Sequence, residues 1–238
     1  MTIDHPVVSR DEWIEARRQF LTREKEFTRL RDALSAERRA LPWVRVDKPY
    51  VFQTPEGEKT LADLFGGRSQ LVVYHLMFGQ DWTEACRSCS FWADNFNGID
   101  VHLRARNVTL IAISSASLEQ IEAFKRRMGW SFEWVSSAGT DFNHDYHVSF
   151  TPEELEQGEV EYNYARRRAL LTELPGISVF YKSPEGTVFH TYSCYARGLD
   201  MLNGAYHYLD LVPKGRDESG HSHPMYWVRL HDSYEGTP

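Results

Sequence analysis

Hydrophobic residues in the first forty positions recur at alternating spacings of three and four, which predicts a long amphipathic helix. Ser9 and Glu12 match an S-x-x-E capping box and mark its start, and Leu41-Pro42 marks its end. The apolar stripe of this predicted helix consists of Trp13, Ala16, Phe20, Phe27, Leu30, Leu34 and Leu41.

Two charged residues, Arg23 and Glu37, fall on the same stripe. A dimerising coiled coil usually has sustained heptads without such polar breaks. The pattern therefore favours a helix that docks on the rest of its own domain, and a homodimer remains the alternative.

After Pro42 the chain alternates short apolar runs with amphipathic segments, a pattern typical of βαβ units. Residues 71–78 form a nearly continuous apolar run, as expected for a central strand covered on both faces. Residues 108–113 predict a second strand. A second capping box at Ser117 and Gln120 predicts a helix that Gly129 closes.

The last third of the chain predicts a β-hairpin and a helix. Residues 177–181 and 187–192 flank Ser183-Pro184-Glu185-Gly186, which suits a type I turn, and a helix is expected over 199–211. We therefore expect a helical extension at 1–45, a main domain at 46–213 and a polar tail at 214–238. Within the main domain, about 130–175 is interpreted as an insertion of loops and one or two helices.

Composition narrows the class of protein. The 238 residues are 42% apolar and 26% charged, close to ordinary globular values. No apolar run approaches the roughly 18 residues that span a bilayer, and residues 1–10 lack the order of a secretory signal. The net charge of −7 argues against a surface that follows phosphates. We expect a cytoplasmic protein with neither nucleic acid nor membrane as partner.

The strongest chemical signal is the pair of cysteines in Cys86-Arg87-Ser88-Cys89. With Cys194 they make three, too few for a disulfide framework. The pair follows the apolar strand and stands at a predicted helix start, where the helix dipole favours thiolate over thiol. The spacing makes Cys86 the attacking sulfur and Cys89, one turn deeper, the resolving sulfur.

A metal site is the first alternative, because Cys-x-x-Cys is also half of many zinc sites. His75, His190 or Cys194 could complete a tetrahedron, but none has a regular ligand spacing. Two clusters, His144 with His147 and a later one of His221, His223 and His231, are more typical of polar loops than of ligand sets. We therefore expect no metal and no organic cofactor.

The order of strand, Cys-x-x-Cys helix, strand, helix, hairpin and last helix resembles the thioredoxin fold over about 61–211. Several segments are also similar to a bacterial thioredoxin-like family of unknown function, whose members are described as predicted dithiol-disulfide oxidoreductases: 61–65, the run to 78, 141–143, 190–193 and 197–200. The resemblance implies a three-layer α/β fold, a mixed central sheet with flanking helices. It also implies exchange with a protein or small-molecule disulfide and with an unidentified reductant.

This chain departs from thioredoxin beside its cysteines. Ala85 replaces the usual aromatic residue, and the nearest tryptophan is Trp82. We expect Trp82, Thr83 and Arg87 to contact the substrate. Pro175 lies one residue before the place of the thioredoxin cis-proline, so it is either a substrate-contacting equivalent or a loop proline.

A thiol peroxidase is the second alternative. Peroxiredoxins are similar in presenting a proline, then a threonine, then the attacking cysteine; here Thr83 is present and Gly79 stands in the proline's place. Cys86 would become a sulfenic acid, which Cys89 or Cys194 would resolve. Arg197 is a candidate for the partner arginine. The missing proline makes disulfide exchange the preferred function.

Overall fold

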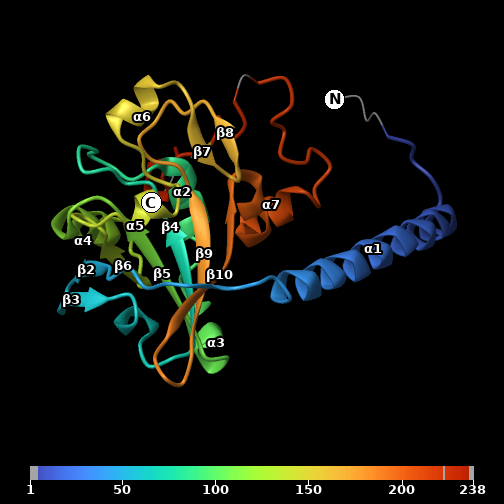
Figure 1. The fold of residues 1–238 in the computed structure, drawn as a ribbon. Helices are drawn as coiled ribbons and strands as arrows, with labels where there is room; N and C mark the ends of the chain where they lie inside the picture. Colours follow the sequence, from blue (N-terminus) through green and yellow to red (C-terminus); the bar gives the residue numbers. More distant parts are fainter. Residues whose placement is uncertain (1–4, 222, 236–238) are drawn as a thin grey trace. The chain divides into compact units, whose positions relative to one another are not determined.

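The computed structural model describes residues 5–221 and 223–235 of a chain that divides into two compact units, residues 1–42 and 43–238. The first unit contains the helix α1 (Arg10–Arg39) (Figure 1). The expected capping box is present, because the Ser9 side chain accepts from the Glu12 amide while the Glu12 carboxylate accepts from the Ser9 amide. No residue of α1 is buried.

The second unit is built on a mixed sheet with the strand order β1-β10-β9-β4-β5-β6-β2-β3 (Figure 1). Its strands are β1 (Val44–Arg45), β2 (Val51–Thr54), β3 (Gly57–Thr60), β4 (Gln70–His75), β5 (Val108–Ser114), β6 (Glu133–Ser136), β9 (Gly176–Lys182) and β10 (Val188–Tyr195). A separate hairpin joins β7 (Val160–Tyr162) and β8 (Ala165–Arg167).

The helical elements of this unit are mostly short. They are η1 (Asp63–Phe65), α2 (Arg87–Ala93), α3 (Asp100–Ala105), α4 (Leu118–Arg127), α5 (Phe142–Asp145), α6 (Pro152–Glu156), η2 (Ala196–Leu202), α7 (Gly204–Leu209) and η3 (His231–Ser233). The helix expected over 199–211 is therefore two pieces, because Asn203 has extended backbone angles and caps α7 with its side chain. Within the described ranges no helix is both long and apolar enough to cross a membrane.

The central strand β4 gives the sheet its thioredoxin-like character. It pairs in parallel with β5 and antiparallel with β9, and β9 and β10 form the expected antiparallel hairpin. The chain leaves β4 directly for the helix that carries the cysteines. This arrangement confirms the expected thioredoxin-like α/β fold with a long N-terminal helix.

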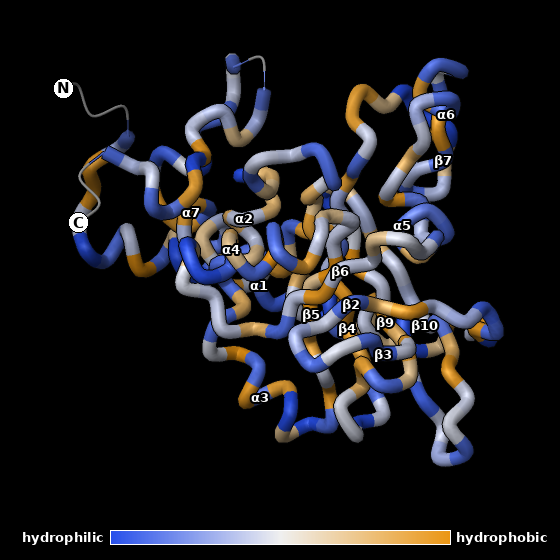
Figure 2. Tube along the Cα trace, turned by 90° about the vertical axis from the view of Figure 1, so that its left-hand side faces the viewer, coloured by the Kyte–Doolittle hydropathy of each residue, from blue (hydrophilic) through white to orange (hydrophobic). Residues whose placement is uncertain are grey.

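Two apolar cores cover the two faces of the sheet, and β4 contributes to both. Leu71 and Val73 pack into one core, whereas Val72 and Tyr74 face the other. Helices α2 and α4 pack on the Tyr74 side, and the segment from β2 to η1, together with α5, packs on the Val73 side. Hydrophobic residues accordingly concentrate along the middle strands in Figure 2. The apolar run that predicted this strand is thus explained by burial on both faces.

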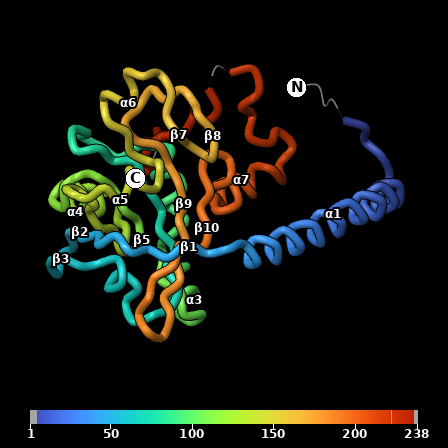
Figure 3. The backbone as a smooth tube through the Cα atoms, in the orientation of Figure 1, coloured from blue at the N-terminus to red at the C-terminus, as the bar shows by residue number. Residues whose placement is uncertain are grey.

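Two segments differ in the structure from what the sequence predicted. Residues 133–136, expected within an insertion, form β6 and pair with β5 in the main sheet. The segment after residue 214, expected as a polar tail, returns to the body: Val228 and Leu230 are buried, and Arg127 of α4 pairs with Asp232 at 2.7 Å. Figure 3 shows this last segment in red.

Candidate active site

Cys86 is the N-cap residue of α2, at the end of a loop that follows β4. Backbone hydrogen bonds fix this loop: the Cys86 amide donates to the Met77 carbonyl at 2.9 Å, and the Ser90 amide donates to the Cys86 carbonyl at 2.9 Å. The expected position at a helix start is therefore correct. It places the Cys86 sulfur beside the free amides of the first helical turn.

The surroundings of Cys86 stabilise its thiolate. The adjacent Cys89 thiol, the backbone N–H groups of Cys89 and Ser88, and the positive charge of Arg87 together lower the pKa of Cys86 to about 6, although partial burial opposes them. Cys86 is partly exposed. At neutral pH it is therefore a thiolate that a small reagent can reach.

Cys89 has the opposite character. It is 2% exposed, and this burial, followed by the nearby Cys86, raises the pKa of its thiol well above the ordinary value. Neither Cys86 nor Cys89 is in a disulfide in this structure. The Tyr74 hydroxyl donates a hydrogen bond to the Cys89 carbonyl at 3.4 Å. The Tyr74 side chain lies in the same apolar core as Cys89, and Cys86 packs against this core. One sulfur is thus ionised and reachable, and the other is protonated and enclosed.

An apolar pocket of about 390 Å³ is lined in part by Cys86 and Cys89. Its walls come from distant parts of the chain: Tyr74, Met77, Ser88, Trp92, Leu171, Leu174, Pro175, Ala196, Arg197, Leu199, Asp200, His223 and Met225. Most of these side chains are apolar. The pocket can therefore hold an apolar group next to a sulfur that reacts with Cys86.

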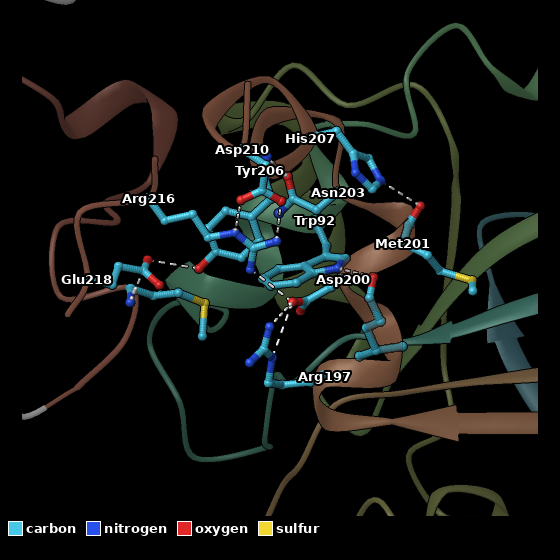
Figure 4. A network of polar contacts seen from close by, with 12 residues as sticks. Trp92, Arg197, Asp200, Met201, Asn203, Tyr206, His207, Asp210, Arg216 and Glu218 are labelled. Carbon is cyan, nitrogen blue, oxygen red and sulfur yellow. Dashed lines mark hydrogen bonds and ion pairs between the residues drawn. The ribbon is translucent and has the colours of Figure 1, made fainter. Parts of the chain in front are cut away.

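A polar network holds one wall of this pocket in place (Figure 4). Arg216 makes two contacts of 2.8 Å with Asp210 and one of 2.9 Å with Asp200, and its guanidinium lies 3.8 Å from the centre of the Tyr206 ring. The Trp92 indole donates to the Leu199 carbonyl at 2.8 Å. These contacts tie the segment after α7 to η2 and α2.

Glu218 extends the network to the far end of the same wall. Its Oε1 atom accepts hydrogen bonds from the Tyr206 hydroxyl, the Trp227 indole and the Met225 amide at 2.9 to 3.0 Å. Met225 is thereby positioned against the cysteine pocket. The wall therefore depends on ionic contacts far from the cysteines in sequence.

Three of the residues predicted to contact the substrate lie together on the other side of Cys86. Trp82, Thr83 and Arg87 line an open pocket of about 460 Å³ with Cys86 and Leu230. Position 79, where peroxiredoxins have a proline, is a glycine in this chain. A Cβ atom at this position would lie 2.9 Å from the Trp82 indole nitrogen. A side chain at position 79 would therefore require the Trp82 indole to shift.

Pro175 lines the apolar pocket just before β9. Its carbonyl accepts a hydrogen bond from the Tyr162 hydroxyl at 2.7 Å. Every peptide bond in the described part of the chain is trans, including the one before Pro175. Pro175 therefore borders the cysteines without the cis geometry of the thioredoxin proline.

The histidines considered as metal ligands have other partners. His75 contacts Asn143 at 3.1 Å and Ser178 at 2.8 Å, and His190 contacts Ser193 at 2.7 Å. His144 lies 3.1 Å from a Glu154 oxygen. Across residues 5–221 and 223–235, no group of three or more His, Cys, Asp or Glu side chains is placed to hold a metal ion.

The pocket residues that the sequence did not reveal come from five separate segments. Trp92 carried a signal, because it continues the three-residue spacing of Cys86 and Cys89 along one helix face. Leu171, Leu174 and Met225 carried none, since only the tertiary fold brings their loops to α2.

Comparisons with known proteins place the chain as follows. A family model described as "Bacterial protein of unknown function (DUF899)" matches residues 2–234. The search of curated proteins found no match.

Solved structures give more distant similarities. Peroxiredoxin Q of Xanthomonas campestris shares 19% identity over 67% of this chain and 89% of that chain, with a TM-score of 0.40. Peroxidoxin BcpB of Mycobacterium tuberculosis shares 10% identity over 68% and 92%, with a TM-score of 0.43. A hypothetical protein of Sinorhizobium meliloti shares 15% identity over 61% and 67%, with a TM-score of 0.38.

Proposed function

The chain belongs to a bacterial family of unknown function, DUF899, and from its own residues we propose that it is a thiol-disulfide oxidoreductase that uses Cys86 and Cys89. The observation that supports this most is the contrast between the two sulfurs. Cys86 is partly exposed with a pKa of about 6, whereas Cys89 is buried and protonated. This contrast suits an attacking thiolate followed by a resolving thiol.

The proposed reaction has two steps. The Cys86 thiolate attacks one sulfur of a substrate disulfide, so that a mixed disulfide forms and the other substrate sulfur leaves as a thiolate. Cys89 then gives up its proton and attacks the Cys86 sulfur, which releases the second substrate thiolate and closes a Cys86–Cys89 disulfide. The substrate gains two electrons from the protein. An external dithiol or thiol reductant then supplies two electrons that reduce the Cys86–Cys89 disulfide.

The raised pKa of Cys89 supports this order of events. A protonated Cys89 is a poor nucleophile toward free disulfides. Its S–H group donates a hydrogen bond to the Cys86 sulfur, and this hydrogen bond stabilises the Cys86 thiolate. Once Cys86 is in a mixed disulfide, its negative charge is lost. The proton on Cys89 is then easier to remove.

The apolar pocket favours a disulfide that carries an apolar group next to its sulfur. Leu171, Leu174 and Met225 would contact this group while the sulfur faces Cys86. Leu174→Ser should therefore raise the KM for a disulfide flanked by phenylalanine residues several-fold and leave that for bis(2-hydroxyethyl) disulfide nearly unchanged. Equal effects on both disulfides would contradict the apolar preference.

Trapping experiments test the reaction itself. Reduced protein treated with iodoacetamide at pH 7 should be alkylated at Cys86 before Cys89, as read by peptide mass spectrometry. Cys86→Ser should abolish turnover with a chemical reductant, and Cys89→Ser should accumulate the mixed disulfide at Cys86. Cys194→Ser should behave as wild type. Absent or equal alkylation of Cys86 and Cys89 would overturn the proposal.

A thiol peroxidase is the second candidate, because Arg197 lines the same pocket as Cys86. Cys86 would then attack the peroxide O–O bond and become a sulfenic acid, with water or an alcohol leaving; Cys89 would condense with it and release water. The glycine at position 79, where peroxiredoxins have a proline, argues against this candidate. Faster consumption of hydrogen peroxide than of disulfide, with a sulfenic acid trapped on Cys86 in the Cys89→Ser variant, would make it the preferred one.

A further inference from the structure

Within the described residues 5–42, no other element covers the apolar stripe of α1. The large side chains of this stripe are Trp13, Phe20, Phe27, Leu30 and Leu34. A helix of 30 residues is about 45 Å long and offers about four heptads. Its apolar stripe, which only Arg23 and Glu37 interrupt, is stabilised in water when a partner covers it.

We propose that this stripe binds the same stripe of a second copy of the chain, in an antiparallel coiled coil that makes the protein a homodimer. Trp13, Phe20, Phe27 and Leu34 follow one another at intervals of seven, so they occupy a single heptad position, the a position. Ala16, Arg23, Leu30 and Glu37 then occupy the d position.

The charges of Arg23 and Glu37, both at d positions, favour a second copy of the chain as the partner and an antiparallel orientation of the two helices. In a parallel pair in register, Arg23 would face Arg23 of the other copy and Glu37 would face Glu37, which places like charges in the seam. In an antiparallel pair, a positions lie level with d positions of the other copy. Phe27 of each copy is then level with Leu30 of the other, at the centre of the seam.

This antiparallel alignment brings the opposite charges together. Arg23 lies level with Leu34 of the other copy and one layer from its Glu37, about 5 Å along the axis. The two-fold symmetry repeats this ion pair, so each copy supplies one arginine and one glutamate. Within its own helix Arg23 contacts Glu26 at 3.4 Å, but both side chains are more than half exposed, so Arg23 is free to turn toward a second partner.

The interruption of the stripe therefore has a function. Residues that weaken a parallel coiled coil are complementary in an antiparallel one, because their charges are opposite and they lie symmetrically about its centre. Polar residues at seam positions are known to set register and orientation at some cost in stability.

The first test measures the oligomeric state of the full chain by sedimentation equilibrium. Wild type should be a dimer at low micromolar concentration. Phe27→Glu places a charge at the centre of the seam and should raise the dissociation constant at least about a hundredfold. Thr22→Glu, which adds the same charge on the exposed outer face of α1, should stay within about threefold of wild type.

The second test establishes direction by exchanging charges. Arg23→Glu alone and Glu37→Arg alone should each weaken the dimer about tenfold or more, and the double variant should return to within about threefold of wild type. A parallel dimer would show no such rescue, since like residues face each other in every variant. This set also remains informative if Phe27→Glu fails to fold.

Several outcomes would overturn the proposal. A monomeric wild type would mean that the stripe is covered by the protein's own second unit or by another protein, and a dimer that Phe27→Glu leaves intact would place the interface elsewhere. Equal dissociation constants for the single and double charge variants would exclude the antiparallel arrangement. Alkylation of Cys86 serves as a folding control, because it reports on residues 43–238.

Discussion

One helical turn separates the two cysteines of the candidate site, and their sulfurs differ in ionisation and in burial. Cys86 lies at the cap of α2, where amides and Arg87 favour its thiolate, while Cys89 lies inside the apolar core. The sequence spacing predicted that the two cysteines share one helix face, because residues three apart lie about one turn from each other on the same side of a helix. The degree of burial of Cys89 was not predictable, since its neighbours come from other elements.

The lowered pKa of Cys86 depends first on the Cys89 thiol. Cys89→Ala removes this donor, so the pKa of Cys86 should rise above about 6 and the thiolate should be lost at a higher pH than in wild type. Iodoacetamide labelling rates between about pH 5 and pH 9 give the midpoint directly. Cys89→Ser keeps a hydroxyl donor and should remain closer to wild type. Identical midpoints for the two variants would show that another group lowers the pKa.

His75 is a buried residue outside the reactive pair. Burial lowers its pKa to about 4, despite its contact with Asn143. Its side chain stacks with Phe142 and Tyr146 in the core opposite the cysteines. The unfolded chain binds the His75 proton near pH 6.5, and the folded chain does so only near pH 4.

The folded state should therefore lose stability as the pH falls from about 6.5 toward 4. From pH 7 to pH 5, His75 alone should remove about 2 kcal/mol from the free energy of unfolding. Urea titrations at both pH values test this, and His75→Gln should be less stable at pH 7 but lose less on acidification. An undiminished loss in His75→Gln would assign the pH dependence to other groups.

At the scale of elements, local signals identified two of the helices that begin with a side-chain cap, α1 and α4, but not the caps of α6 and α7. The box at Ser117 and Gln120 begins α4, as expected: the Gln120 amide donates to the Ser117 hydroxyl, which donates in turn to the Gln120 side chain. The short strand β6 was missed, because four residues beginning with Glu133 carry little periodicity and become a strand only by pairing with β5.

The α4 cap also offers a stability test. Ser117→Ala leaves first-turn amides without a side-chain acceptor and should lower the free energy of unfolding by about 1 kcal/mol. Ser117→Thr keeps the hydroxyl and should stay within about 0.5 kcal/mol of wild type. Chemical denaturation of the reduced protein measures both. Equal losses for the two variants would mean that packing around Ser117, rather than the cap, determines the effect.

At the scale of the whole molecule, the C-terminal segment completes the second unit. Leu230 is 6% exposed and packs into the same core as Cys89, and His231 contacts Asp94 at 2.7 Å. The segment also carries Met225, which lines the cysteine pocket, and Glu218, which accepts a hydrogen bond from the Met225 amide. The high content of glycine, histidine and charged residues after position 214 concealed these few anchoring side chains.

Shortening the Leu230 side chain should therefore destabilise the entire second unit. Leu230→Ala should lower the free energy of unfolding by about 2 to 5 kcal/mol, because it leaves a cavity in the core. Leu211→Ala removes the same atoms from a side chain that is 82% exposed and should change stability by less than about 0.5 kcal/mol. Thermal unfolding of both variants compares them. A negligible effect of Leu230→Ala would mean that the segment detaches readily.

The sequence alone determined the long N-terminal helix, the central strand, the α4 helix, the hairpin and the location of the reactive pair. Each of these rests on interactions within a few residues: a cap, a period, a turn or a helical spacing. The tertiary structure decided the strand order, the apolar pocket with its walls at Leu174 and Met225, and the return of residues 223–235 to the core. Those features arise when segments far apart in the chain exclude water together, and no local pattern records which segments will meet.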